Sequence, residues 1–151
     1  MFEKANGGYG VMQIHHLNGK LFKKILKTEP EAHYHSEQGK ILTQLWLHDG
    51  SQTATDIALA SGLANNTLTV MLKHMEEQGL VSICPHKKDK RKKVISLTEL
   101  GWQQKEIGIR VSNRLGDIFY QGFSNQEIKE FESYQNRILE NLKKADKKVR
   151  L

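Results

Sequence analysis

The feature that most constrains the fold lies mid-chain, where two short helical patterns meet at a tight turn. Thr53-Ala-Thr-Asp56 matches a helix-capping box, and Gly62 suits the left-handed position at which a helix ends. A second helical pattern begins only a few residues later, near Ala64 or Asn65, and runs to Gln78. Two helices joined by so tight a turn predict a helix-turn-helix.

The residues after this motif change to the period of β-strands. Leu80-Val-Ser-Ile83 and Lys93-Val-Ile-Ser-Leu97 are rich in β-branched and apolar side chains, and the loop His86–Lys92 separates them, which predicts a hairpin. Residues 85–93 carry six Lys and Arg side chains against one acid, Asp89, in a chain whose formal net charge is +6. The positive charge is therefore concentrated in the hairpin loop, and this favours an acidic partner such as nucleic acid.

Helical patterns precede the motif. Apolar residues recur at spacings of three and four in a first helix, which we expect to begin after the glycine-rich stretch and to end before Pro30; they are Val11, Ile14, Leu17, Leu21 and Ile25. A second helix is expected from about Ser36 to His48, where the turn signal Asp49-Gly50 follows.

Two further helices are expected after the hairpin. Thr98 caps a long fifth helix that ends near Gly122, and Ser124-Asn-Gln-Glu127 is a capping box for a sixth. The charged residues Lys143 to Arg150 are expected to fray. With 151 residues and no linker, the chain predicts one mainly α domain of six helices with a small β-hairpin wing.

The second helix of a helix-turn-helix lies in the DNA major groove, and its N-terminal residues meet the base edges. Here those residues are Asn65, Asn66, Thr67 and Thr69, with Lys73 one turn further on. Asn can bond adenine through two hydrogen bonds, and a Thr methyl can pack on thymine. Because Asn is also a common helix cap, we expect one of the two asparagines to cap the helix and the other to contact DNA.

The loop of the hairpin supplies the second group of candidate residues. Lys87, Lys88, Lys90 and Arg91 would neutralise phosphates, and an Arg can also enter a narrow minor groove. Asp89 opposes phosphate binding, so its presence needs a reason. The simplest one is an ion pair that fixes the loop and orients Arg91.

Several motifs in order make the resemblance to one family specific. Leu45 to Gly101 resembles the winged helix-turn-helix of the MarR family. The matching pieces are Thr67-Leu-Thr69, Glu76-Glu-Gln-Gly-Leu-Val81, Asp89-Lys-Arg91 and Leu97-Thr-Glu-Leu-Gly101. One departure is Val70, which stands where many relatives carry a basic residue.

The resemblance implies a sequence-specific transcriptional regulator, with a repressor as the leading expectation, that binds a pseudo-palindromic operator as a two-fold homodimer. It places the DNA-binding lobe at about residues 36–98 and the dimerisation helices at about 8–30 and 99–145. Relatives are commonly released from DNA by a small aromatic or phenolic effector, which binds between the dimer helices and the lobe. Candidate lining residues for such a site are His15, Leu17, Trp46, Trp102 and Ile107, although Trp and Leu at helical spacing more often belong to the plain core.

Other interpretations of the chain are weaker. An architectural DNA-binding protein of low sequence preference is the alternative function. An enzyme is not expected, because the sequence has no phosphate-binding glycine loop, nucleophile elbow or dense cluster of Asp, Glu and His. No cofactor, metal or membrane partner is expected either, although His15, His16, His33 and His35 carry imidazoles of the kind that bind zinc.

The single cysteine bears on compartment and on redox chemistry. Cys84 cannot form an intramolecular disulfide, and no signal peptide or membrane span is evident, so we expect a cytoplasmic protein. Nearby basic groups could activate this thiol toward oxidants. Its position at the end of a strand instead favours a buried structural role.

Overall fold

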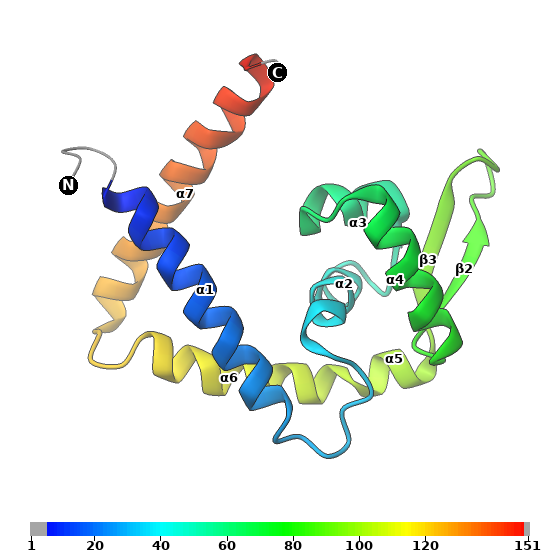
Figure 1. Cartoon of the computed structure of the whole chain (residues 1–151), viewed down its shortest axis with the longest axis horizontal. Helices are drawn as coiled ribbons and strands as arrows, with labels where there is room; N and C mark the ends of the chain where they lie inside the picture. The colour runs from blue at the N-terminus through cyan, green and yellow to red at the C-terminus, as the bar shows by residue number, and fades with distance from the viewer. Residues whose placement is uncertain (1–5, 150–151) are drawn as a thin grey trace. The chain divides into compact units, whose positions relative to one another are not determined.

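A computed structural model describes residues 6–149 and divides the chain into two compact units, with the boundary between Leu115 and Gly116. The first unit holds α1 (Asn6–Leu26), α2 (Ser36–Leu47), α3 (Ala54–Ser61), α4 (Asn65–Glu77) and three strands (Figure 1). The mainly α fold with a small β-wing is confirmed. None of the helices within residues 6–149 combines the length and the apolar character needed to cross a membrane.

The wing belongs to a three-stranded sheet rather than to an isolated hairpin. β2 (Val81–Pro85) and β3 (Lys93–Leu97) pair antiparallel, and β1 (Ser51–Thr53) adds to the far edge of β3 in the order β1-β3-β2. The third strand was not predicted, because a run of three polar residues carries no strand period. The Oγ atoms of Ser51 and Ser96 lie 2.7 Å apart across the β1–β3 pair.

The core of the first unit surrounds α2. Ile41, Leu42 and Leu45 on α2 are completely buried, and α2 lies against α1, α3, β1 and β3. Residues from α4 and the sheet complete the cluster: Leu68, Leu72, Met75, Leu80, Val81 and Ile95. Leu68, Leu72 and Met75 form the inward face of α4, and burial of this face leaves the opposite face of the helix in solvent.

Capping residues fix where the helices begin and end. The Thr53 hydroxyl accepts a hydrogen bond from the backbone of Asp56 at 3.2 Å, and Gly62 ends α3 in the left-handed conformation with φ of 72°. Thr98 caps α5 (Glu99–Gln103) by accepting a hydrogen bond from the backbone of Gly101 at 3.1 Å. These helix starts and this helix end were predicted. The start of α1 was not, because α1 begins at Asn6 and includes the glycine-rich stretch that we expected to precede it.

The expected long fifth helix is interrupted once. α5 (Glu99–Gln103) and α6 (Lys105–Phe119) are separated by Gln104, and α6 ends before Gly122. The Gln104 side chain is buried; its Oε1 accepts from the backbone of His33 at 2.8 Å, and its Nε2 donates to the carbonyl of Glu31. The interruption therefore coincides with a polar side chain that ties this helix pair to the α1–α2 connection.

The second unit contains the end of α6 and α7 (Asn125–Lys148). The capping box predicted for α7 is confirmed, with Ser124 Oγ accepting from Glu127 N at 3.1 Å and Glu127 Oε1 accepting from Ser124 N at 2.8 Å. Aromatic rings at the turn form the unit's own packing; they belong to Phe119, Tyr120, Phe123 and Phe131. The helix continues through the charged stretch that we expected to fray as far as Lys148, while Arg150 lies outside the described residues.

Candidate nucleic-acid interface

The polar side chains predicted to read bases lie together on the exposed face of α4. Asn65, Asn66, Thr67, Thr69 and Lys73 are all exposed, whereas Leu68 and Leu72 between them are buried in the core. The 3.6-residue period of the helix accounts for this separation. All five side chains are therefore available to a partner along one helix.

The expectation that one asparagine caps α4 is wrong. Ala64 occupies the N-cap position and has no side chain that can accept a hydrogen bond. Asn66 Oδ1 accepts from the backbone of Thr67 at 3.0 Å, and the Thr69 hydroxyl donates to the carbonyl of Asn65 at 2.8 Å. The Asn65 side chain thus does not serve as a cap, and the Thr69 hydroxyl donates to the backbone of its own helix.

A pair of glutamines, one buried and one at the surface, anchors the other end of α4. Gln38 Nε2 on α2 donates to Gln78 Oε1 at 2.7 Å, and Gln38 Oε1 accepts from the backbone of His35 at 3.2 Å. Gln38 is 2% exposed, whereas Gln78 lies at the surface, so the pair reaches from the core to the end of α4. A satisfied buried amide of this kind orients the two helices relative to each other.

A carboxylate joins α4 to the wing. Glu76 Oε2 accepts a hydrogen bond from the backbone of Ile83 on β2 at 3.1 Å. The two elements predicted to contact DNA are therefore connected directly as well as through the core.

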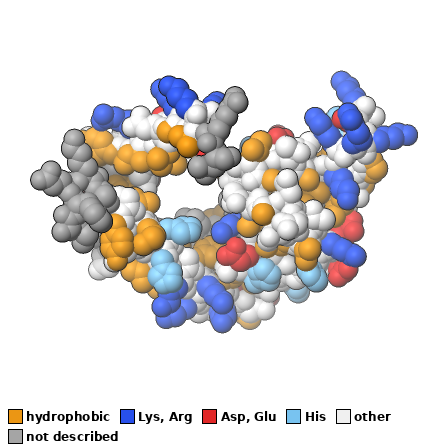
Figure 2. Space-filling model, turned by 45° about the horizontal axis from the view of Figure 1, so that its top comes forward, with side chains coloured by type: hydrophobic (Ala, Val, Ile, Leu, Met, Phe, Trp, Pro, Cys, Tyr) orange, Lys and Arg blue, Asp and Glu red, His pale blue; other side chains and the backbone are white. Residues whose placement is uncertain are grey.

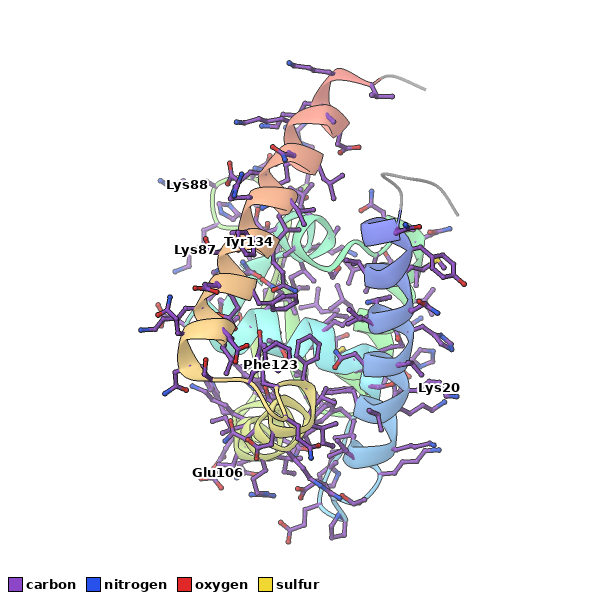
Figure 3. All side chains as sticks on the ribbon, turned by 90° about the vertical axis from the view of Figure 1, so that its left-hand side faces the viewer. Lys20, Lys87, Lys88, Glu106, Phe123 and Tyr134 are labelled. Carbon is purple, nitrogen blue, oxygen red and sulfur yellow. The ribbon has the colours of Figure 1, made fainter. Side chains whose placement is uncertain are left out.

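The wing loop presents its cations to solvent. Lys87, Lys88, Lys90 and Arg91 are exposed, and blue side chains gather at the tip of the wing in Figure 2. Lys87 and Lys88 extend outward from the loop between β2 and β3 (Figure 3). The group agrees with the predicted basic tip.

The predicted ion pair within the loop is present. Arg91 Nε lies 3.2 Å from Asp89 Oδ1, and the same oxygen accepts from the Arg91 backbone at 3.1 Å. These hydrogen bonds from Arg91 hold the pKa of Asp89 below its usual range. The Arg91 side chain is 90% exposed, so the pair fixes the guanidinium stem and leaves its outer face open.

A groove beside the predicted base-reading residues was not foreseen. It encloses about 850 Å³ along α4 and the start of α2, and it includes Asn66 and Thr67. His35, Val70, Met71 and His74 also line it. Sequence reasoning missed these four because their proximity depends on how α2 packs against α4.

The residues predicted to line an effector site do not come together. Trp46 donates through Nε1 to the carbonyl of Gly101 at 3.0 Å, Ile107 is in the core, and Leu17 is exposed on α1. Of the five candidates, His15 lines a cavity: about 470 Å³ between α1, α2 and α3. The other lining residues include Asn18, Phe22, Lys40, Thr43 and Gln44.

The cysteine side chain differs from expectation, and the histidines do not gather. Cys84 is exposed on β2, so the predicted buried structural thiol is wrong, because the side chain points away from the core at the outer end of the strand. Within residues 6–149, no three His, Cys, Asp or Glu side chains are grouped as a metal site would require.

Comparison with known proteins places this architecture in a family. The family model described as "MarR family" matches residues 35–93. The organic hydroperoxide resistance transcriptional regulator of Bacillus subtilis (strain 168) is 34% identical over 101 residues, which cover 67% of each chain.

Solved structures share the fold at lower identity. A mutant MarR from E. coli, complexed with operator DNA, has a TM-score of 0.77 at 19% identity over 91% of this chain and 99% of its own. Bordetella bronchiseptica BpsR, described as regulated in its DNA binding by 6-hydroxynicotinic acid, has a TM-score of 0.75 at 16% identity over 88% and 98%. The extent and identity of the B. subtilis match, with the family model over the winged lobe, show that this chain belongs to the MarR family of transcriptional regulators.

Proposed function

We propose that the chain reads an operator through α4 and the wing, as a homodimer whose DNA affinity is set by a small effector. The observation that carries the proposal is the placement of exposed polar side chains on α4 and of exposed cations on the wing of the same lobe. The E. coli relative with this fold is complexed with operator DNA. In a bacterial cell such a regulator works in the cytoplasm, and it needs no catalytic step.

The exposed apolar faces support the homodimer. No described residue of α7 is buried, and four of its large apolar side chains are at least half exposed to solvent: Tyr134, Ile138, Leu139 and Leu142. Tyr9, Val11, Met12 and Leu17 on α1 are similarly exposed. Two helices with such stripes need a partner to bury them, and a second copy of the chain supplies the same surfaces by two-fold symmetry.

The cavity between α1, α2 and α3 is the proposed effector site. Phe22 offers an aromatic surface, while Asn18, Thr43 and Gln44 can bond polar substituents. A small aromatic ligand with polar substituents matches this lining, and 6-hydroxynicotinic acid, named for BpsR, is of that class. A ligand here contacts both α1 and the lobe, so it can change the spacing of the two lobes in a dimer.

The test separates the two DNA-contacting elements. DNA selected by the protein from a random pool should be a pseudo-palindrome with half-sites about 10 base pairs apart. Asn66→Ala and Thr67→Ala should change which bases are preferred, whereas Lys87→Ala and Lys88→Ala should weaken all sequences alike. Each lost phosphate contact should reduce the salt slope by about one unit.

Asp89 and Arg91 sharpen this test. If the ion pair orients Arg91 toward DNA, Asp89→Ala weakens binding although it removes a negative charge. Simple electrostatics predicts the opposite sign. Equal or tighter binding by Asp89→Ala on every probe would show the wing to be a basic patch without an orienting pair.

An architectural protein of low specificity is the second candidate, favoured only by the exposed lysines of the wing. Binding isotherms on the selected site and on random DNA at one salt concentration distinguish the two. A regulator should prefer its site by roughly a thousandfold or more. Equal affinities would favour the architectural function.

A further inference from the structure

His86 holds the wing tip together from inside. Its backbone N–H donates to the carbonyl of Lys92 at 2.8 Å, which closes the loop. Its ring Nδ1 accepts from the backbone N–H of Lys88 at 3.1 Å and from that of Asp89 at 3.2 Å. One side chain thus satisfies two main-chain donors in the segment that carries the cations.

The chemistry of these bonds fixes the form of the ring. Nδ1 can accept only through its lone pair, so the imidazole must be neutral with its proton on Nε2. A proton on Nδ1 would face two N–H donors and would release both. Asn, Asp and Ser side chains accept in the same way from nearby backbone N–H groups in ordinary turns, but they do not lose this capacity near neutral pH.

We propose that His86 is the positioning residue of the wing: its neutral ring holds the loop in the form that binds DNA, and its protonation releases the loop. The inference rests on the proposed role of the wing in DNA binding. Lys88 and Asp89, whose amides donate to it, adjoin Lys87, Lys90 and Arg91, so the same bonds set where the wing's cations stand.

Other ionisable groups lie around His86. The hydrogen bonds from Arg91 lower the pKa of Asp89, so acidification to about pH 5.5 leaves its carboxylate charged. The other ionisable groups nearby are the lysines and Arg91 of the loop, Cys84 on β2 and Lys93 on β3. Lysines, arginines and thiols ordinarily titrate above neutrality, and histidine is the side chain that changes charge between about pH 5 and 8.

Three variants in the full chain test the inference. His86→Phe keeps a ring but removes the acceptor, so its operator affinity at about pH 7.5 should fall about tenfold, as expected for two lost hydrogen bonds. His86→Asn restores an acceptor and should bind within about twofold of the parent. His48→Phe, which changes an exposed imidazole at the end of α2, is the matched control and should bind like the parent.

The pH profile separates positioning from simple charge. Acidification from about pH 7.5 to about pH 5.5 should weaken binding by the parent and by His48→Phe more than binding by His86→Asn, which cannot be protonated there. If His86→Asn loses affinity as steeply as the parent, another group causes the decline. Parent-like binding by His86→Phe, or equal weakness of the Phe and Asn variants, would also overturn the inference.

A second measurement is independent of DNA. Hydrogen exchange of the Lys88 and Asp89 amides in the free protein should be slow in the parent and in His86→Asn, and fast in His86→Phe. If no DNA is bound specifically but this order holds, the proposed function fails while the role of His86 in the loop stands. If these amides exchange alike in all three proteins, the positioning role is wrong.

Discussion

The winged lobe and α7 use similar apolar residues in opposite ways. In α2, Ile41 and Leu45 are fully buried within a single chain. On α7, Ile138 is 50% exposed to solvent and Leu142 is 61% exposed. The lobe is therefore a self-contained fold, but the second unit buries little beyond its aromatic turn. The winged lobe thus covers its own apolar side chains, whereas α7 leaves apolar surface that the proposed second copy of the chain would cover.

The largest effect is expected from charges on the apolar face of α7. Ile138→Glu combined with Leu142→Glu should abolish the dimer, because a buried unpaired carboxylate is costly. DNA affinity should fall by roughly 100-fold or more, since the two lobes no longer bind as a linked pair. Sedimentation gives the mass, and Asn136→Glu on another face of α7 is the control. A double variant that remains a dimer would break the comparison.

The matched experiment within the lobe uses two leucines on one helix. Leu45→Ala should lower the free energy of unfolding by about 3 kcal/mol, because it leaves a cavity in the core. Leu47 lies on the same helix but is 71% exposed, so Leu47→Ala should lower the free energy of unfolding by less than about 0.5 kcal/mol. Urea unfolding measures both, and similar losses would mean that Leu47 is also covered in the assembled protein.

A smaller loss is expected where the lobe meets α5. A Cβ on Gly101 would run into the backbone carbonyl of Leu80, so Gly101→Ala should cost about 2 kcal/mol. Gly19→Ala in α1, where a Cβ meets open space, should instead raise stability by up to about 1 kcal/mol. Thermal unfolding of the two variants should therefore shift in opposite directions; a shared direction would contradict this packing.

The smallest effect concerns the start of α7. Hydrogen bonds from Ser124 hold the pKa of Glu127 below its usual range. The charged carboxylate of Glu127 therefore stabilises the folded helix at pH values above the ordinary pKa of a glutamate. This contribution is lost as the pH falls through the lowered pKa of the folded state. Helical content should therefore drop slightly more in the parent than in Glu127→Gln between about pH 5 and 3. Parallel curves would show that the charged carboxylate adds nothing.

Local signals predicted most of the winged lobe and the start of α7. The periodicity of α4, the Ser124 capping box and the Asp89–Arg91 pair all depend on residues within a few positions of each other, so the sequence carries them directly. The exposure of the wing's cations was predictable as well, because consecutive charged residues in a short loop mark it in the sequence.

The missed features depend on residues far apart in the chain. The contact from Gln38 to Gln78 spans 40 residues, and the cavity at His15 needs three helices to meet. The strand β1 has no period of its own and exists because β3 offers an edge. No pattern of spacing in one segment encodes such arrangements, which explains why the other effector candidates lie outside the cavity that His15 lines.

The hydrogen bond from Ile83 to Glu76 has a consequence for the DNA itself. It joins α4, the proposed base-reading helix, to the wing, and so it restrains the angle between the two. A duplex that meets both must supply the matching distance from major to adjacent minor groove. Base steps that the protein never touches would then affect affinity through the stiffness and groove width they impose. The operators of this protein should therefore resemble one another in DNA shape over a longer stretch than the one in which their base sequences agree.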